Sequence, residues 1–396
     1  MATLHRKTFG VIALILVVCP FLLLAACGKK EEPKAGPTQP APPPRVTIQG
    51  VEPPSVPAPS GTFENPQYAT TKVYYATDRN ITSLNATAQQ LYGPDRAEVS
   101  YGVCEVAIPR EHQMGELESP SVWKMEWKYY PEKHVTLLST TITSASDFHA
   151  LLRDRIKQSP RSNAFLFVHG YNVSFHDAAR RTAQMAYDLG FQGAPIFYSW
   201  PSQFNVAKYT VDEQNIEWSQ TNLRQFIDDV LATSGAKDVY LIAHSMGSRG
   251  LTRAVASLIK SKPEYRERIR EIILAAPDID AAVFKRDILP EFVTAQLPVT
   301  LYASSKDNAL IASKEVHGYA RAGDSGRGLV VQPGLETIDA SDLDTGLLGH
   351  SYYGESSVIG DMYRLTQLRK RASERDGLKA VTIAAGKYWK LPAKSP

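Results

Sequence analysis

The chain has 396 residues, of which 43% are hydrophobic and 21% charged, and its formal net charge at pH 7 is +3. This near-neutral balance argues against nucleic acid as the main partner, because nucleic-acid-binding domains carry a clustered excess of Lys and Arg. The length and apolar content are sufficient for one large core, alone or with a small appendage.

Residues 1–26 have the pattern of an export signal. A basic start over 5–7 precedes an apolar run over 9–24, which is shorter than the roughly 20 residues that span a bilayer as a helix. The run closes with Leu-Ala-Ala-Cys at 24–27, which resembles the bacterial lipobox. An uncleaved membrane anchor is the alternative interpretation.

The lipobox resemblance implies a lipid-anchored protein of the Gram-negative cell envelope. Cleavage would leave Cys27 as a diacylglycerol-modified N-terminus, and Gly28 in place of Asp after it favours the outer membrane, facing the periplasm. Several acyl chains, at about 0.8 kcal/mol per buried methylene, would anchor it stably. Residues 27–61 contain many prolines and few large apolar groups, so we expect an extended, semi-rigid linker.

The part from about residue 70 to 145 has the pattern of strands joined by turns. We expect strands at 72–76, 102–108 and 134–143, with a turn cluster at 77–80. From Ser146 onward, strand-like and helix-like segments alternate. The expected strands there are 164–168, 195–198, 239–243, 271–275, 299–303 and a weaker one at 329–332, and the expected helices include 174–190, 212–233 and 249–260.

Strands separated by helix-length segments predict an α/β fold with a mainly parallel central sheet and helices on both faces. An N-terminal strand-rich portion precedes this alternation. We place the domain at 62–370 and expect the lysine-rich end, 371–396, to be a solvated basic tail.

The segment 239–250 predicts a catalytic nucleophile. An apolar strand leads directly into Ser245, which has small residues two positions away on either side, Ala243 and Gly247. This is the pattern of a nucleophile elbow, a sharp strand-to-helix turn that needs small neighbours because the two backbones lie close together. A simple Ser/Gly turn is the alternative.

A serine hydroxyl becomes a nucleophile when a base accepts its proton and a carboxylate orients that base. In α/β-hydrolases the acid and then the histidine follow the serine along the chain. Asp307 lies in the exit loop of the strand two after the elbow strand, and His350 lies in a glycine-rich loop beyond one further strand. We therefore expect Ser245 as nucleophile, His350 as general base and then acid, and Asp307 as the orienting acid.

Other residues could take two of these roles. Asp278 and Asp280 follow the strand before that of Asp307, and they could be the acid or could cap the next helix. His317 is the other histidine downstream of the serine, and it lies before the last expected strand of this region.

The oxyanion formed on a carbonyl substrate needs two amide donors. We expect the amide of Met246, directly after the nucleophile, and the amide of Tyr171 in the loop after strand 164–168, with Asn172 as the alternative to Tyr171. We expect His169 and His244 to be structural. The sequence has no His-Glu-x-x-His, P-loop or paired-cysteine spacing, so no metal and no cofactor is indicated.

Seven short segments in this order resemble a bacterial α/β-hydrolase family of unassigned function, whose members are often described as lipoproteins or esterases. The segments are 73–79, 167–172, 198–202, 243–249, 276–280, 305–310 and 349–353. The resemblance covers residues 68–365 and implies the α/β-hydrolase fold with Ser245, Asp307 and His350 as its triad. It implies no substrate.

These patterns together predict an envelope-anchored serine hydrolase, esterase- or lipase-like, that cleaves an ester, thioester or amide of a small molecule or lipid. Serine at the elbow argues against haloalkane dehalogenases and epoxide hydrolases, which have aspartate there. A non-catalytic envelope binding protein on an α/β-hydrolase shell is the alternative, since fold does not fix function. A lipase working at the membrane surface is a third interpretation, but no segment is clearly an apolar lid.

Overall fold

The computed structural model describes residues 65–121, 125–305, 313, 318–343 and 358–392. These residues belong to one compact unit that extends from Ser55 to Pro396. The predicted export signal, Cys27 and the linker lie outside the described residues, as do Asp307, His317 and His350.

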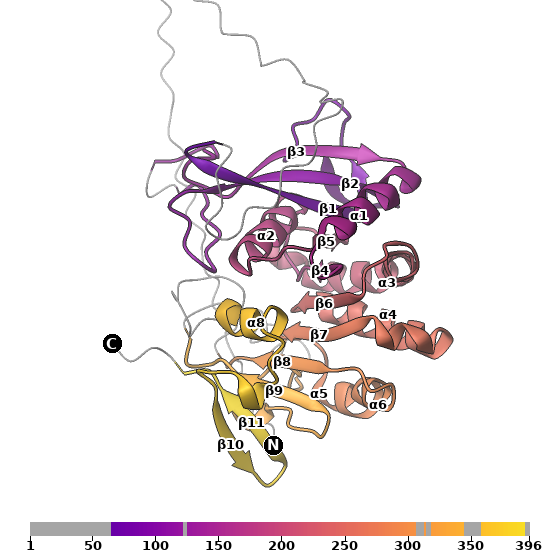
Figure 1. Cartoon of the computed structure of the whole chain (residues 1–396), viewed down its shortest axis with the longest axis vertical. Coiled ribbons are helices and arrows are strands. Elements are labelled where there is room, and N and C mark those ends of the chain that lie inside the picture. Colours follow the sequence, from indigo (N-terminus) through magenta and orange to yellow (C-terminus); the bar gives the residue numbers. More distant parts are fainter. Residues whose placement is uncertain (1–64, 122–124, 306–312, 314–317, 344–357, 393–396) are drawn as a thin grey trace, which may run out of the picture. The chain divides into compact units, whose positions relative to one another are not determined.

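The strands form one sheet in the order β10-β11-β9-β8-β7-β6-β4-β5-β1-β2-β3 (Figure 1). Every neighbouring pair from β9 to β1 is parallel, and so is β11 with β9. The pairs β1–β2, β2–β3 and β10–β11 are antiparallel. The strands are β1 (Tyr68–Ile81), β2 (Tyr92–Pro109), β3 (Thr136–Thr143), β4 (Asn163–Val168), β5 (Ala194–Ser199), β6 (Asp238–His244), β7 (Ile269–Ala275), β8 (Val299–Ala303), β9 (Leu335–Asp339), β10 (Lys379–Ile383) and β11 (Gly386–Lys390).

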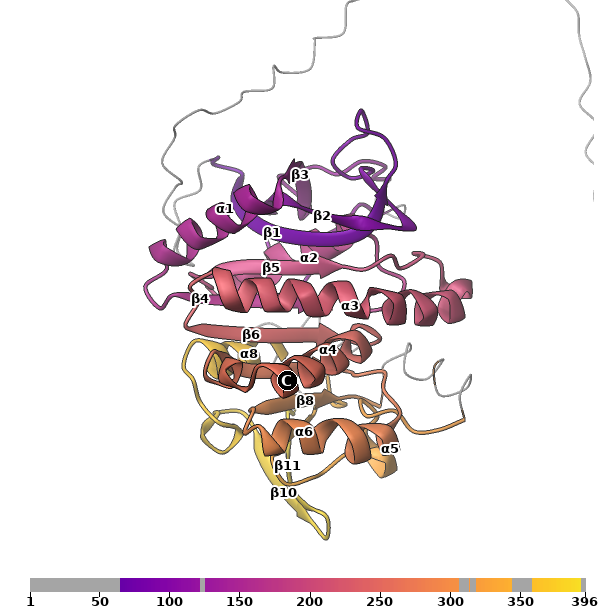
Figure 2. The same ribbon diagram turned by 90° about the vertical axis from the view of Figure 1, so that its right-hand side faces the viewer.

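Helices cover both faces of this sheet. The buried side chains of α2 and α8 belong to one core cluster, and those of α1, α3, α4 and α6 belong to the other. Figure 2 shows the second group lying in front of the strands. The helices are α1 (Ala145–Gln158), α2 (Phe175–Asp188), α3 (Tyr209–Thr233), α4 (Gly247–Ser261), α5 (Ala281–Val283), α6 (Leu289–Thr294) and α8 (Val358–Thr366).

Local sequence signals explain where these elements lie. All six residues of β4 are buried, which fits its continuous apolar run, because a central parallel strand is covered on both faces. The Ser174 side chain caps α2 by accepting a hydrogen bond from the Asp177 amide, as its position predicts. The predicted mainly parallel sheet with helices on both faces and the strand-rich N-terminal portion are confirmed.

Two expected local features are wrong. Thr77, Asp78 and Arg79 are fully buried within β1, which continues to Ile81, so residues 77–80 are not a surface turn. The last strand of the parallel core is β9 rather than 329–332. Residues 329–332 do not pair in the sheet. Their apolar pattern reflects the burial of Val330 and Val331.

The C-terminal segment differs from the expected solvated tail. Trp389 of β11 pairs with Ile338 of β9, so the hairpin of β10 and β11 extends the sheet. Arg375 is buried and forms ion pairs with Asp361 (2.6 Å) and Glu336 (3.0 Å). Residues 371–392 therefore belong to the folded unit, although their lysine-rich composition indicates a solvated end.

Candidate active site

The turn that carries Ser245 is strained. Ser245 follows β6 directly, α4 begins at Gly247, and Ser245 has a φ of 49°. Residues other than glycine rarely adopt this left-handed conformation, which costs about 1–3 kcal/mol and persists only where the surroundings enforce it. Here the Ser245 amide donates to the Ala275 carbonyl (2.9 Å), and the Asp278 amide donates to the Ser245 carbonyl (3.1 Å). The backbone thus has the sharp strand-to-helix turn that the sequence predicts.

Two glycines bring the loop after β4 against this turn. A Cβ on Gly247 would collide with the carbonyl oxygen of His169, and a Cβ on Gly170 would lie 3.0 Å from the Cβ of Ser245. Both positions therefore require glycine for close approach. As a result, the loop that begins at His169 lies directly beside the candidate nucleophile.

Asn172, the alternative to Tyr171 as the second oxyanion donor, is held by a buried carboxylate. Asn172 has a φ of 57°, and its amide donates to the buried carboxylate of Asp212 (3.2 Å). Asp212 also accepts hydrogen bonds from the Ser202 hydroxyl (2.6 Å) and the Gln203 amide (2.7 Å). The Asn172 amide is therefore engaged with Asp212. Met246 is buried directly after Ser245.

A buried cation that the sequence reasoning missed holds these loops. The Arg79 guanidinium donates to the carbonyls of Val173 (2.7 Å) and Ser202 (2.8 Å) and to the Ser199 hydroxyl (2.9 Å). Burial lowers the pKa of Arg79 to about 9 against the opposing effect of nearby carboxylates, so the group stays charged at neutral pH. Arg79 thereby links β1 to the segments that follow β4 and β5. Its place in the segment 73–79 was the available signal.

His169 supports the same loop. It is buried, its ring stacks on Trp200 with centroids 5.0 Å apart, and its Nδ1 lies 2.8 Å from the Gly170 carbonyl. Burial, with the Arg79 charge nearby, lowers the pKa of His169 to about 3, so the ring is neutral. This agrees with the structural role expected for it. Tyr198 and Trp200 are fully buried and pack in the core.

Asp278 and Asp280, the two alternative acids, have structural partners. Asp278 Oδ1 accepts from the Ser313 hydroxyl (2.5 Å) and lies 3.2 Å from Arg321 Nε. Its Oδ2 accepts from the Tyr209 hydroxyl and from Arg249 Nη2 (3.1 Å). The carboxylate of Asp280 instead caps α5 by accepting from the first amides of that helix, as its sequence position allows.

The described strands bring the expected loops to one edge. Strands β6, β7, β8 and β9 are parallel neighbours, so their carboxyl ends lie at the same edge of the sheet as Ser245. Asp307 follows β8 along the chain and His350 follows β9, but both residues lie outside the described part of the structure.

The described residues show neither a metal site nor a membrane-spanning helix. They contain no group of three or more His, Cys, Asp or Glu side chains that could hold a metal ion. None of the described helices has both the length and the hydropathy needed to cross a bilayer.

The sheet order, the two helical layers and the turn at Ser245 define an α/β-hydrolase fold. The model of a family described as "Alpha/beta hydrolase of unknown function (DUF900)" matches residues 144–370. The match spans more than half of the chain, which therefore belongs to this family of α/β hydrolases.

The chain is also similar to solved structures. Est1E from Butyrivibrio proteoclasticus is 12% identical with a TM-score of 0.31, over 52% of this chain and 87% of Est1E. A cold-adapted esterase from an Arctic intertidal metagenomic library is 10% identical with a TM-score of 0.35, over 78% of this chain and 97% of the esterase. TM-scores this low establish no shared fold by themselves, so the assignment depends on the topology and the family match. No curated protein matches the sequence.

Proposed function

We propose that the protein is a serine hydrolase that cleaves an ester, with thioesters and amides as related substrates, and that Ser245 is its nucleophile. The observation that carries this proposal is the strained backbone of Ser245 at the turn from β6 to α4. An ordinary Ser/Gly turn would place glycine at the left-handed position, whereas here the serine itself adopts that conformation. A strained non-glycine residue of this kind is typical of functional sites.

The proposed reaction proceeds through an acyl-enzyme. The Ser245 hydroxyl attacks the substrate carbonyl while His350 accepts its proton and Asp307 orients the imidazole. The amides of Met246 and Tyr171 stabilise the oxyanion. His350 then protonates the leaving alcohol. In the second half of the reaction, His350 accepts a proton from a water molecule, the water oxygen attacks the acyl carbonyl, and His350 returns the proton to Ser245 as the carboxylic acid leaves.

A fluorophosphonate probe tests the nucleophile, because it reacts covalently with activated serines. We expect labelling of the wild-type protein, none of Ser245→Ala, and strongly reduced labelling of His350→Ala. Ser248→Ala is the matched control. Ser248 is a buried serine at the start of α4, three positions after Ser245, and the variant should be labelled like the wild type. Folded wild-type protein that resists the probe between about pH 6 and 9 would favour the non-catalytic binding protein instead.

The substrate is proposed only as a class, a small-molecule or lipid ester. A series of p-nitrophenyl esters of increasing acyl length would define the preferred acyl group. Saturation of turnover by short esters, with Ser245→Ala as the blank, would indicate a small-molecule esterase. Turnover confined to long esters above their solubility limit would indicate a lipase.

We also propose that Cys27 carries the lipid that anchors the protein in the envelope. The supporting observations are the Leu-Ala-Ala-Cys sequence and the proline-rich segment after it. An alkyne analogue of palmitate fed to producing bacteria should label the wild type but not Cys27→Ser, and the variant should leave the membrane fraction. Equal labelling of both proteins would contradict the anchor at this residue.

A further inference from the structure

A groove lies at the opposite edge of the sheet from Ser245. Its wall includes Glu271 near the start of β7, Pro298 just before β8 and Gly334 just before β9, and these positions mark the amino ends of the strands. The groove has a volume of about 430 Å³. Sites for small molecules have volumes of roughly 300–1,000 Å³, so this groove is large enough for one.

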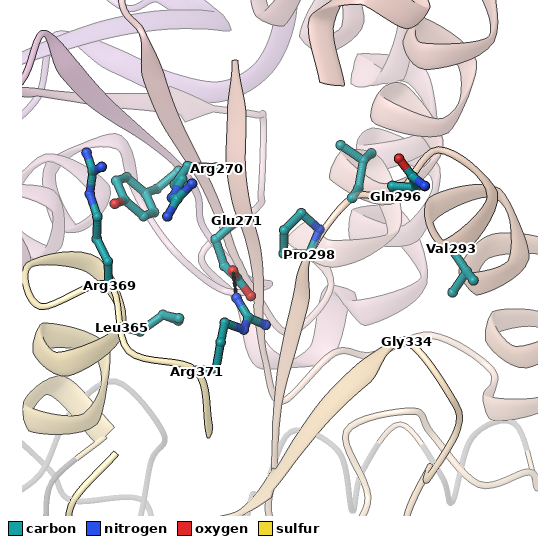
Figure 3. Close-up of a pocket in the computed structure, with 11 residues that line it drawn as sticks. Arg270, Glu271, Val293, Gln296, Pro298, Gly334, Leu365, Arg369 and Arg371 are labelled. Atoms are coloured by element: carbon teal, nitrogen blue, oxygen red, sulfur yellow. Dashed lines mark hydrogen bonds and ion pairs between the residues drawn. The ribbon is translucent and has the colours of Figure 1, made fainter. Parts of the chain in front are cut away.

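One side of the groove is cationic. Figure 3 shows Arg270 and Arg369 on one side of Glu271, with Arg371 joined to the Glu271 carboxylate. Arg371 is neutralised by the buried carboxylate of Glu271 (2.6 Å) and by Glu336 (3.0 Å). Arg369 is paired with Asp238.

Arg270 differs from these two arginines. It is exposed, and within the described part of the chain it forms no ion pair or hydrogen bond. The groove therefore presents one uncompensated guanidinium next to two that carboxylates hold in place. Such a group binds a carboxylate through paired N–H donors.

The other side is largely apolar. Figure 3 shows Val293 and Pro298 there, with the polar Gln296 beside them. Val293 is 42% exposed although it is aliphatic. Gly334 has a φ of 81°, and a Cβ there would lie 2.7 Å from Val293 Cγ2. Glycine at this position leaves the space beside Val293 open.

We propose that this groove binds a small organic anion in which a single carboxylate is attached to a short apolar chain. The carboxylate would pair with Arg270, and the chain would cover Val293 and Pro298. One uncompensated positive charge matches a monoanion better than a phosphate dianion, because a second negative charge would lie near Glu271 and Asp238 without a cation of its own. The site is separate from Ser245 and does not depend on the proposed hydrolase activity.

Calorimetric titration of the full chain with sodium octanoate tests this inference. We expect saturable binding that Arg270→Gln weakens by about tenfold or more, since it removes a charged hydrogen-bonding partner of the carboxylate. Val293→Asp, at a half-exposed position, should weaken binding similarly by repelling the anion. Octanol and inorganic phosphate should each bind at least about tenfold more weakly than octanoate, because each lacks one half of the ligand.

Two controls separate this groove from other sites. Arg153→Gln removes an exposed arginine of α1, at the other end of the sheet, and should bind octanoate like the wild type. Ser245→Ala should also bind it unchanged. Octanoate binding that both Arg270→Gln and Val293→Asp leave intact, or a wild-type protein that shows no saturable binding, would overturn the proposal whether or not Ser245 proves to be a nucleophile.

Discussion

The charged residues at the carboxyl-terminal edge of the parallel strands have different surroundings from the ion pair that joins β1 and β2. At the carboxyl edge Arg79, Asp212 and Asp278 are buried, and each makes three or more polar contacts with groups from different segments. In the antiparallel pair of β1 and β2, the Lys72–Glu105 ion pair is 3.9 Å long and nearly half exposed. Exposed pairs contribute about 0–1 kcal/mol, whereas breaking a buried network costs several kcal/mol.

This difference indicates where the molecule requires a fixed geometry. Buried polar groups are costly unless every partner is present, so those at the carboxyl edge hold its loops in one arrangement. Ser245 lies within that edge, and its strained backbone needs such support. Substitutions at this edge can show whether the support is as local as the contacts indicate.

The largest effect is expected at Gly247. Gly247→Val would drive a branched side chain into the carbonyl of His169 and separate α4 from the loop after β4. We expect loss of fluorophosphonate labelling and destabilisation by about 4 kcal/mol or more, measured by urea unfolding, because backbone cannot yield as a side chain can. The control is Gly328→Ala, because a Cβ there would lie 3.3 Å from a side-chain atom of Asp324 and would not collide with backbone. This variant should keep its labelling. A Gly247→Val protein that folds and reacts normally would show that the close packing is not needed.

The next effect separates support from catalysis at the carboxyl edge. Asp278→Asn removes the charge that Arg249 and Arg321 share, so we expect destabilisation by about 3–5 kcal/mol. Asp307→Asn should change the unfolding free energy little and reduce the rate of labelling strongly, because its predicted role is to orient His350. The reverse pattern, with stability lost in Asp307→Asn and only labelling lost in Asp278→Asn, would assign the acid to Asp278.

The sequence was sufficient for the alternation of parallel strands and helices and for the turn at Ser245, because both depend on local signals. Apolar runs mark the buried parallel strands, and small residues at 243 and 247 mark the close approach. The sequence was insufficient to predict the burial of Arg79 and Arg375. The residues around Arg79 resemble a surface turn, and those around Arg375 resemble a solvated tail. Their burial depends on partners far along the chain, Val173 and Ser202 for Arg79 and Glu336 and Asp361 for Arg375.

The triad could be predicted only as a set of positions along the chain. Strand order brings the segments after β8 and β9 to the edge that holds Ser245, and that much follows from alternating strands and helices. Sequence alone could not separate Asp307 from Asp278. The structure adds the donors around Asp278, which come from Tyr209, Arg249, Ser313 and Arg321 in four different segments, and the choice of Asp307 stays a prediction.

The smallest effect is expected away from the candidate site, at the loop between β2 and β3. His112 is buried between Asp188 (2.9 Å) and Glu118 (2.8 Å). Burial opposes its charge, but the hydrogen bonds and charges of these two carboxylates prevail and raise the pKa of His112 to about 9. A histidine whose folded-state pKa is raised stabilises the fold fully below its unfolded pKa of about 6.5, and this contribution is lost as the pH rises through about 9.

We therefore expect the free energy of unfolding to fall by roughly 1–3 kcal/mol between about pH 6.5 and 9, and His112→Gln to lack most of that fall. Urea unfolding of both proteins at several pH values measures it. A wild-type protein whose stability stays constant over the same range, or a variant with the same slope, would mean that His112 is not charged between its two carboxylates. The antiparallel end would then contain a neutral hydrogen-bonded histidine, as the buried core does at His169.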